Sequence, residues 1–233
     1  MSTRIAVLAS GRGSNLEALA SHVERRAAGM ATVVLAASDR ADAGALDVAR
    51  AHGIAAAALD MGPDHARALG ALLATHRIDL VVLAGYLRLV PPDVVRAWRG
   101  RIVNVHPALL PAFGGPGMYG ARVHRAVLAA GARVSGVTVH FVDEVYDRGA
   151  TIAQWPVPVR DDDTPAALAA RVLRVEHLLL PRAVLALARG DVRLADDGRA
   201  LWMPRAMTAT AAFLLRDTDD DDLARSIDAA LGA

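Results

Sequence analysis

The sequence predicts an α/β protein with a mostly parallel, twisted sheet that carries helices on both faces. Short segments that are apolar throughout are expected to be buried strands, at residues 4–9, 31–37, 54–59 and 80–83. Segments with helical spacing of apolar residues alternate with them, at residues 15–28, 42–52 and 63–76. Continuous apolar strands that alternate with helices are typical of a parallel sheet buried on both sides. The 233 residues leave room for one ordinary domain of this class.

The first strand and the first helix justify this interpretation in detail. The strand at 4–9 runs into a tight loop at 10–14, and the following helix places Leu16, Leu19 and Val23 on one face. Apolar residues three or four positions apart form the stripe that a helix turns toward a core. The unit therefore has the strand–loop–helix order from which parallel sheets are built.

The second half of the chain departs from this strict alternation. It is expected to contain a short helix from Pro91–Pro92, a strand at 102–105, a helix at 121–130, strands at 134–142 and 151–159, and a helix from the Thr164 cap to about 188. The two longer strands alternate in polarity, and we expect them to pair antiparallel with a functional loop between them.

The C-terminal part is expected to extend the sheet domain. Gly190 closes the long helix, and residues 192–202 are predicted to form a hairpin around Asp196-Asp197-Gly198. Asp217 and the run 219–222 indicate a solvated linker and a terminal amphipathic helix. We therefore expect a single α/β domain at 1–190, and a hairpin and tail at 191–233 that is not an independent domain.

Composition excludes several classes of function. The 26 basic and 25 acidic residues are spread along the chain, without the basic block that neutralises nucleic acid phosphates, so no nucleic-acid partner is expected. Cysteine is absent, which removes thiolate nucleophiles and thiolate metal sites. Lysine is absent as well, which removes Schiff-base chemistry. No apolar run reaches membrane-spanning length or forms a signal peptide, so a cytoplasmic protein is expected.

The loop at residues 10–15 (SGRGSN) is a candidate phosphate site. It joins the first strand to the first helix, at the edge where open α/β sheets bind ligands. Backbone amides at a helix N-terminus suit an anion, and Ser14 and Asn15 add side-chain donors. The dinucleotide fingerprint fails, because Leu16 stands at its third glycine, and the Walker motif fails for want of lysine. A tight turn with an ordinary cap is the alternative.

The segment Asn104-Val105-His106-Pro107 carries the clearest sign of chemistry. Side chains alternate along a strand, so Asn104 and His106 point to the same side. An amide donor and an imidazole on one side can hold a developing oxyanion, and Asp147, in a later loop, could orient or charge the imidazole. Together they indicate acyl-type transfer.

Each of these residues also has an ordinary structural interpretation. Asn104 could cap a strand, His106 could bond the backbone of its loop, and Asp147 could be a turn residue or a partner of Arg148. His140 and the Glu176-His177 pair show no metal-ligand spacing and are interpreted as core or surface positions.

Four ordered motifs resemble those of the phosphoribosylglycinamide formyltransferase family, folate-dependent enzymes of de novo purine synthesis. The motifs are residues 8–16 (LASGRGSNL), 83–88 (LAGYLR), 104–111 (NVHPALLP) and 139–147 (VHFVDEVYD). Their order and separations are those of the family, and the similarity runs from about Arg4 to Gly190. The resemblance implies a formyltransferase-type Rossmann-like fold.

The resemblance also implies a reaction and a set of site residues. The formyl group of 10-formyltetrahydrofolate, a cosubstrate, would pass to the amine of glycinamide ribonucleotide without a metal. Asn104, His106 and Asp147 would be catalytic, with protonated His106 and Asn104 holding the oxyanion. Ribonucleotide contacts are implied for Gly13, Ser14, Asn15, Pro107 and Glu176. Folate contacts are implied for Tyr86, Leu87, Arg88, Leu89, Val90, Glu144, Val145 and Tyr146, with Arg88 nearest the anionic glutamate tail.

Two departures from the family pattern affect the rim of the site. The segment 112–120 is longer than in shorter family members, and an arginine that they carry before the helix at 63–76 has no clear counterpart, because Arg67 comes late. Three alternatives stay open: a formyltetrahydrofolate hydrolase, a methionyl-tRNA formyltransferase-like enzyme, and a non-catalytic folate- or nucleotide-binding module. The expected partners are small molecules only, with neither nucleic acid nor membrane, and a homodimer is left open.

Overall fold

The computed structural model describes residues 2–203 and 219–231 and divides into two compact units. The first unit contains the described residues up to Asn104 together with Val142–Glu144. The second contains Val105–Phe141 and the described residues from Val145 onward. The described part of the chain has no helix long and apolar enough to cross a membrane.

A parallel sheet forms the centre of the first unit, in the strand order β3-β2-β1-β4-β5. Its strands are β1 (Thr3–Leu8), β2 (Ala31–Ser38), β3 (Ala55–Ala58), β4 (Leu80–Leu83) and β5 (Ile102–His106), the last of which continues into the second unit. β1 pairs in parallel with β2 on one side and with β4 on the other. β2 and β3 are added on one side of β1, and β4 and β5 on the other, so the strand order reverses between β1 and β4. Sheets of this kind bind ligands at such a point.

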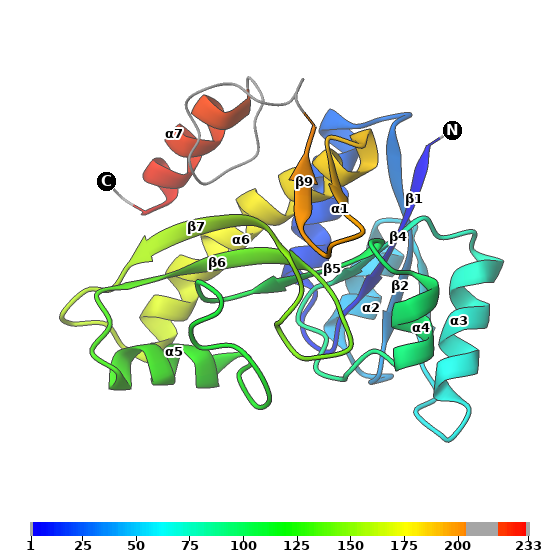
Figure 1. Cartoon of the computed structure of the whole chain (residues 1–233), viewed down its shortest axis with the longest axis horizontal. Helices are drawn as coiled ribbons and strands as arrows, with labels where there is room; N and C mark the ends of the chain where they lie inside the picture. Colours follow the sequence, from blue (N-terminus) through cyan, green and yellow to red (C-terminus); the bar gives the residue numbers. More distant parts are fainter. Residues whose placement is uncertain (1, 204–218, 232–233) are drawn as a thin grey trace. The chain divides into compact units, whose positions relative to one another are not determined.

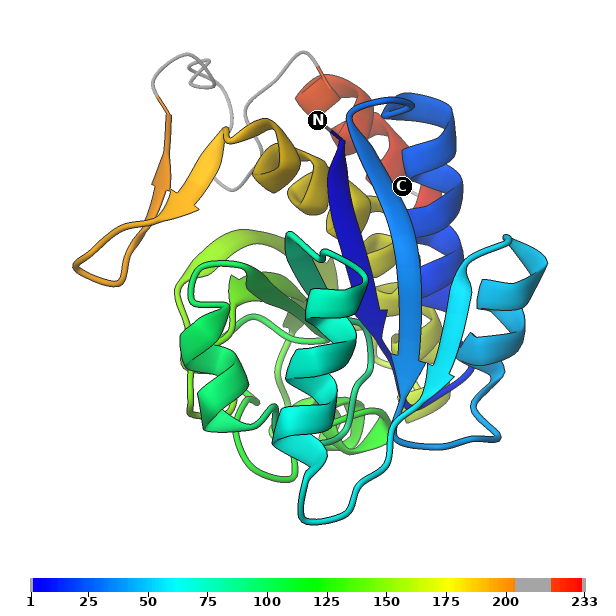
Figure 2. The same ribbon diagram turned by 90° about the vertical axis from the view of Figure 1, so that its right-hand side faces the viewer.

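Helices cover both faces of this sheet, as the sequence predicts. They are α1 (Ser14–Arg26), α2 (Gly44–Ala51), α3 (His65–Thr75) and α4 (Pro92–Ala97). Figure 2 shows α1 and α2 on one face of the sheet and α3 and α4 on the other. The α3 side contains a cluster of buried residues from both layers, among them Leu8, Leu35, Leu69, Leu73 and Val81. Burial of each such side chain contributes about 1.5–3 kcal/mol to folding.

The second unit is built on an antiparallel pair of strands. β6 (Val134–Phe141) pairs with β7 (Thr151–Pro158), which confirms the expected antiparallel pairing. α5 (Ala121–Ala129) and the long α6 (Pro165–Arg189) belong to the same unit, and α6 contacts β6, β7 and α5 (Figure 1). The Thr164 hydroxyl caps α6 by accepting a hydrogen bond from the Ala167 N–H at 3.1 Å.

The C-terminal elements complete the second unit. β8 (Val192–Leu194) and β9 (Ala200–Trp202) form the predicted hairpin. α7 (Asp219–Leu231) packs against α6 and buries Ile227 completely. The Arg160 side chain donates a hydrogen bond to the carbonyl of Leu231 at 3.2 Å, which ties the end of α7 to the loop after β7. The predicted linker with Asp217 falls within 204–218, outside the described residues.

Candidate functional site

The loop between β1 and α1 is shaped by close contact with α2. Gly13 is the N-cap of α1 and has a left-handed φ of 87°. A Cβ atom on Gly13 would lie 2.6 Å from the Cα of Ala45, and the Ala45 N–H donates to the carbonyl of Gly11 at 3.0 Å. Only glycine fits both the backbone conformation and the approach of α2. Gly13 therefore has a structural role in this loop, in addition to the phosphate contact that the resemblance implies.

The start of α1 offers the features of an anion site. The helix has no side-chain cap, and the first N–H groups of any helix lack partners within it. Ser14 is half-buried, whereas Asn15 is buried within the unit. The partial positive charge of a helix N-terminus adds to the attraction for an anion.

The candidate folate segment after β4 divides into buried and exposed residues. Tyr86 and Val90 belong to the core cluster on the α3 side of the sheet. Leu87 and Leu89, two positions apart in the chain, are large apolar residues with 44% and 39% exposure. The Arg88 Nε atom lies 3.2 Å from Oδ2 of Asp39, so this arginine already has a carboxylate partner within its own unit.

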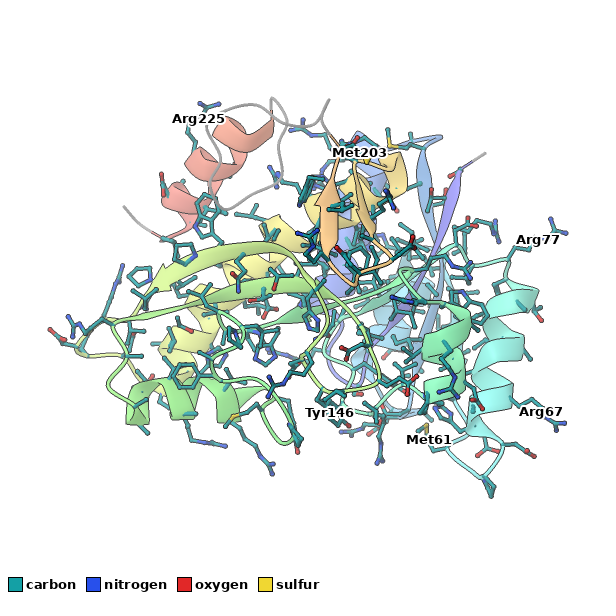
Figure 3. The ribbon with its side chains drawn as sticks, in the orientation of Figure 1. Met61, Arg67, Arg77, Tyr146, Met203 and Arg225 are labelled. Atoms are coloured by element: carbon teal, nitrogen blue, oxygen red, sulfur yellow. The ribbon has the colours of Figure 1, made fainter. Side chains whose placement is uncertain are left out.

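Other residues assigned to the folate pocket lie at the surface of their units. In the first unit, the Glu144 carboxylate accepts a hydrogen bond from Arg96 at 2.9 Å. In the second, Val145 and Tyr146 are exposed on the loop between β6 and β7, where Figure 3 labels Tyr146. Arg67, which comes late relative to the family pattern, projects from α3 with a side chain that is 84% exposed (Figure 3).

His106 is the buried centre of the polar cluster in the second unit. Its Nε2 atom lies 2.9 Å from the carbonyl oxygen of Phe113, and its Nδ1 atom lies 3.6 Å from Oδ2 of Asp147. A carbonyl only accepts hydrogen bonds, so Nε2 carries a proton in this arrangement. Burial lowers the pKa of His106, while Asp147 and the Phe113 carbonyl act in the opposite direction. Burial has the larger effect, so the pKa lies below its ordinary value and the neutral imidazole is more favoured than for a histidine in water.

Asp147 holds a second imidazole that the sequence interpretation treated as a core or surface position. The Nε2 atom of His140 lies 3.6 Å from Oδ1 of Asp147, whereas His106 faces the other carboxylate oxygen. The Gly115 N–H donates to Oδ2 at 2.8 Å. Burial acts to raise the pKa of Asp147, but the facing His140, the charge of His106 and the Gly115 N–H outweigh it, and the pKa is lowered. Asp147 is therefore a carboxylate between two histidines.

His140 could have been found from strand alternation. Thr138 and His140 are polar residues two positions apart in β6, so they share one face of the strand. Thr138 donates a hydrogen bond to the carbonyl of Ala108 at 2.7 Å and accepts one from the Leu110 N–H at 3.0 Å. The polar face of β6 thus supports the segment that follows His106 and also contacts Asp147.

The loop after His106 is held in an uncommon backbone conformation. Phe113 has a φ of 55° and Gly115 a φ of 99°. Between them, a Cβ atom on Gly114 would lie 3.2 Å from the Cβ of Asp147. This conformation directs the Phe113 carbonyl to His106 and the Gly115 N–H to Asp147, so the long loop places two of the polar contacts of the cluster.

A third histidine lies close enough to His106 to interact with it electrostatically. His124 in the first turn of α5 is 4% exposed. Burial, and secondly the charge of His106, lower its pKa to about 4. At neutral pH His124 is therefore uncharged, and it does not oppose protonation of His106.

Asn104, Pro107 and Glu176 are the remaining residues that the sequence assigns to the site. Asn104 is half-buried on β5, on the same strand face as His106 but at the end of the first unit. Pro107 is half-buried, and Glu176 is buried in α6 with 7% exposure. Contacts of 3.6 Å join Asp147 to both His106 and His140 within the second unit. Among the described residues, no group of three histidine, aspartate or glutamate side chains could hold a metal ion.

Comparisons with known proteins agree with the family resemblance. The family model described as formyl transferase matches residues 3–184. A chloroplastic phosphoribosylglycinamide formyltransferase from Vigna unguiculata is 40% identical over 207 residues, which cover 87% of this chain and 66% of that protein. The trifunctional purine biosynthetic protein adenosine-3 of Bos taurus is 39% identical over 86% of this chain and 20% of its own length. This chain thus spans just under two thirds of the plant protein and a fifth of the bovine one.

The similarity extends to solved structures. The phosphoribosylglycinamide formyltransferase of Anaplasma phagocytophilum superposes with a TM-score of 0.80 at 33% sequence identity. The match covers 92% of this chain and 98% of that one. Its extent confirms the predicted α/β class with a mostly parallel sheet and late antiparallel strands.

Proposed function

The chain belongs to the formyl transferase family, and from this premise we propose that it transfers the formyl group of 10-formyltetrahydrofolate to the amine of glycinamide ribonucleotide, a step of purine biosynthesis. The single observation that supports this reaction best is the buried cluster in which Asp147 faces His106, two residues after Asn104 on β5. Such a cluster supplies an oxyanion donor and a path for a proton.

In the proposed reaction, the ribonucleotide amine attacks the formyl carbon and a new C–N bond forms. Negative charge then collects on the former carbonyl oxygen. Asn104 donates a hydrogen bond to this oxygen. Protonated His106 donates a second one from Nε2, in place of its bond to the Phe113 carbonyl, together with its charge. Donors placed in advance at such an oxygen each lower the barrier by about 2.7–4 kcal/mol. The intermediate collapses when the bond to the folate nitrogen breaks and that nitrogen takes up a proton.

Proton movement is assigned to Asp147 and its two histidines. Each imidazole stands between two acceptors, because the second nitrogen of His140 lies 2.7 Å from the carbonyl of Phe141. A neutral imidazole satisfies one acceptor, whereas an imidazolium satisfies both. For His106 these acceptors act against burial, which still keeps its pKa lowered. The arrangement allows the proton lost by the attacking amine to pass through Asp147 toward the departing folate nitrogen.

Substrate binding is proposed at the sites that the resemblance implies. The ribonucleotide phosphate binds at the start of α1 through Gly13, Ser14 and Asn15, and the rest of the ribonucleotide contacts Pro107 and Glu176. The folate binds along Tyr86–Val90 and the Glu144–Tyr146 loop. The exposed apolar side chains of Leu87 and Leu89 suit a flat aromatic ring. Formylfolate is a cosubstrate in this scheme, and no step requires a metal.

The proposal includes the organisation and setting of the enzyme. Residues 1–190 act together as one catalytic domain, and residues 191–233 add a hairpin and tail that do not fold independently. The partners are small molecules, a homodimer is compatible with the scheme, and the proposed location is the cytoplasm. The plant relative is named as chloroplastic, so fractionation of cells that express the chain is the test of location.

An assay with one substrate omitted distinguishes this function from its alternatives. The enzyme is supplied with 10-formyltetrahydrofolate, with and without glycinamide ribonucleotide, and the rate at which tetrahydrofolate forms is measured. We expect turnover only when the ribonucleotide is present. Turnover that ignores the ribonucleotide would favour a hydrolase, and binding without turnover would favour a non-catalytic module. Formylation of methionyl-tRNA in place of the ribonucleotide would favour the tRNA-directed enzyme.

A further inference from the structure

A buried carboxylate links the two proposed substrate loops of the first unit. The Ser10 hydroxyl, at the start of the β1–α1 loop, donates to Oδ1 of Asp39 at 2.5 Å. The same hydroxyl accepts a hydrogen bond from the Leu87 N–H at 2.9 Å. Asp39 Oδ2 lies 3.2 Å from the Nε atom of Arg88. Asp39, at the end of β2, thus bonds to one loop directly and to the other both directly and through Ser10.

The side chains of Ser10 and Asp39, the two residues at the centre of this network, are buried. The Asp39 side chain is only 5% exposed, although it carries a charge that is costly to remove from water. Ser10 is also buried, with 3% exposure, and its N–H donates to the carbonyl of Gly85 at 3.1 Å. Replacement of Ser10 or Asp39 would leave the other buried and short of a partner, which is the costly way to lose a hydrogen bond, whereas the Arg88 side chain is 60% exposed.

We propose that Asp39 is a positioning residue that couples binding of the two substrates. The inference rests on the proposed function, in which the Ser10–Asn15 loop holds the ribonucleotide phosphate and the Tyr86–Val90 segment holds the folate. Asp39 belongs to neither set of proposed ligand contacts. It acts by fixing three groups: Ser10, which begins the phosphate loop, the backbone N–H of Leu87 and the side chain of Arg88.

The direction of the coupling follows from the cost of ordering. A ligand that fixes one loop also reduces the freedom of the other, because both hydrogen-bond to the same carboxylate. The second ligand then loses less conformational entropy when it binds, so the affinity rises. Linkage requires that each substrate raise the affinity for the other by the same factor. We expect a factor of about 5 or more, the lower end of measured couplings.

The test measures the dissociation constant of tetrahydrofolate by calorimetry, with and without saturating glycinamide ribonucleotide. Tetrahydrofolate carries no formyl group, so the ternary complex does not react. In the wild-type chain the ribonucleotide should lower this constant about 5-fold or more. In Asp39→Ala the ribonucleotide should change the dissociation constant of tetrahydrofolate by less than about 2-fold. The KM values of this variant should change more than its kcat at saturating substrates.

Two further variants separate positioning from general stability. Asp39→Asn keeps an acceptor for the Ser10 hydroxyl and should retain most of the coupling, so it serves as the conservative rescue. Ser10→Ala removes the hydroxyl shared by Asp39 and the Leu87 N–H and should abolish the coupling. It keeps the inference testable if Asp39→Ala fails to fold. The matched control is Asp42→Asn, an exposed acid whose partner is Arg40, which should keep the wild-type ratio.

Three outcomes would overturn the inference. The first is a tetrahydrofolate dissociation constant that the ribonucleotide changes less than about 2-fold in the wild-type chain. The second is a wild-type change in this constant that persists in both Asp39→Ala and Ser10→Ala. In either case, if both ligands still bind and the formyl group is still transferred, the proposed function stands and only the coupling role of Asp39 is lost. Failure of the wild-type chain to bind either ligand would overturn both proposals together.

Discussion

His140 presents its Nε2 atom to the Oδ1 oxygen of Asp147 at a distance of 3.6 Å. The other carboxylate oxygen faces Nδ1 of His106 at the same distance. The two histidines therefore compete for one negative charge, and substitution of Asp147 and of His140 should shift the pH dependence of the reaction in opposite directions. This relationship gives the first two predictions.

Asp147→Asn should move the alkaline limb of the rate profile to lower pH. The carboxylate raises the pKa of His106 against the effect of burial, so its loss lets the pKa of His106 fall further. If the imidazolium is the active form, activity is then lost at a lower pH as the pH rises. The measurement is kcat against pH at saturating substrates, and an alkaline limb that coincides with that of the wild type would refute the pairing.

His140→Asn should move the same limb to higher pH, with a smaller loss of kcat. The charge of His140 lowers the pKa of His106, so its removal raises that pKa and extends the active form upward. The pH profile of this variant is to be compared with that of Asp147→Asn. A shift of both variants in the same direction would mean that the two histidines do not share the carboxylate in the working enzyme.

Asn104→Ala should depress kcat without moving the pH profile. The carboxamide does not titrate, and loss of one oxyanion donor typically costs about 10²–10³-fold in kcat. Single-turnover formyl transfer measured from acid to alkaline pH checks both parts of the prediction. A rate within a few-fold of the wild type would remove Asn104 from the oxyanion site.

Gly13→Ala should destabilise the chain even when no ligand is present. The added Cβ would approach the Cα of Ala45 to 2.6 Å in a left-handed backbone, and each effect costs about 1–3 kcal/mol. Gly11→Ala is the matched control from the same loop, because a Cβ there meets nothing within 4 Å. Urea unfolding should show a loss for Gly13→Ala only. Equal stability of the two variants would contradict the packing explanation. Because Gly13→Ala affects stability, phosphate binding is better tested with Ser14→Ala.

Arg171→Met should lower the free energy of unfolding by about 3–5 kcal/mol, the usual cost of removing one partner from a buried ion pair. Arg171 and Asp163 form two hydrogen bonds of 2.7 Å, and their side chains are 5% and 2% exposed. Arg171 lowers the pKa of Asp163 below its ordinary value of 3.8. The stabilisation is therefore present above the ordinary pKa and is lost as the pH falls through the lower, folded-state value. Unfolding curves at neutral and strongly acidic pH should show a difference that shrinks in acid.

Most of the fold could be predicted because local patterns and sheet burial agree. The apolar strands, the antiparallel pair β6–β7 and the hairpin around Gly198 all follow from periodicity and turn residues. Helix ends were less predictable: α3 begins at His65, two residues after the proline at 63. End residues of a helix depend on a few backbone hydrogen bonds that periodicity does not specify.

The site could be predicted only in part, because several of its contacts come from the backbone or from distant chain segments. Asn104, His106 and Asp147 carry recognisable side chains at strand ends. The Phe113 carbonyl on His106 depends on a positive φ in the long loop, which residue type alone does not reveal. The bond between Arg88 and Asp39 joins residues far apart in the sequence. The sequence assigns the Arg88 charge to the folate tail and does not reveal that it also pairs with this carboxylate.

The fate of the formyl group tests the central claim most directly. The wild-type enzyme is given 10-formyltetrahydrofolate with an isotopically labelled formyl carbon, together with glycinamide ribonucleotide, and the labelled products are separated and identified. We predict that the label appears on the glycinamide nitrogen in an amount equal to the tetrahydrofolate released. Recovery of the label as free formate would contradict the account, because water rather than the amine would then be the acceptor.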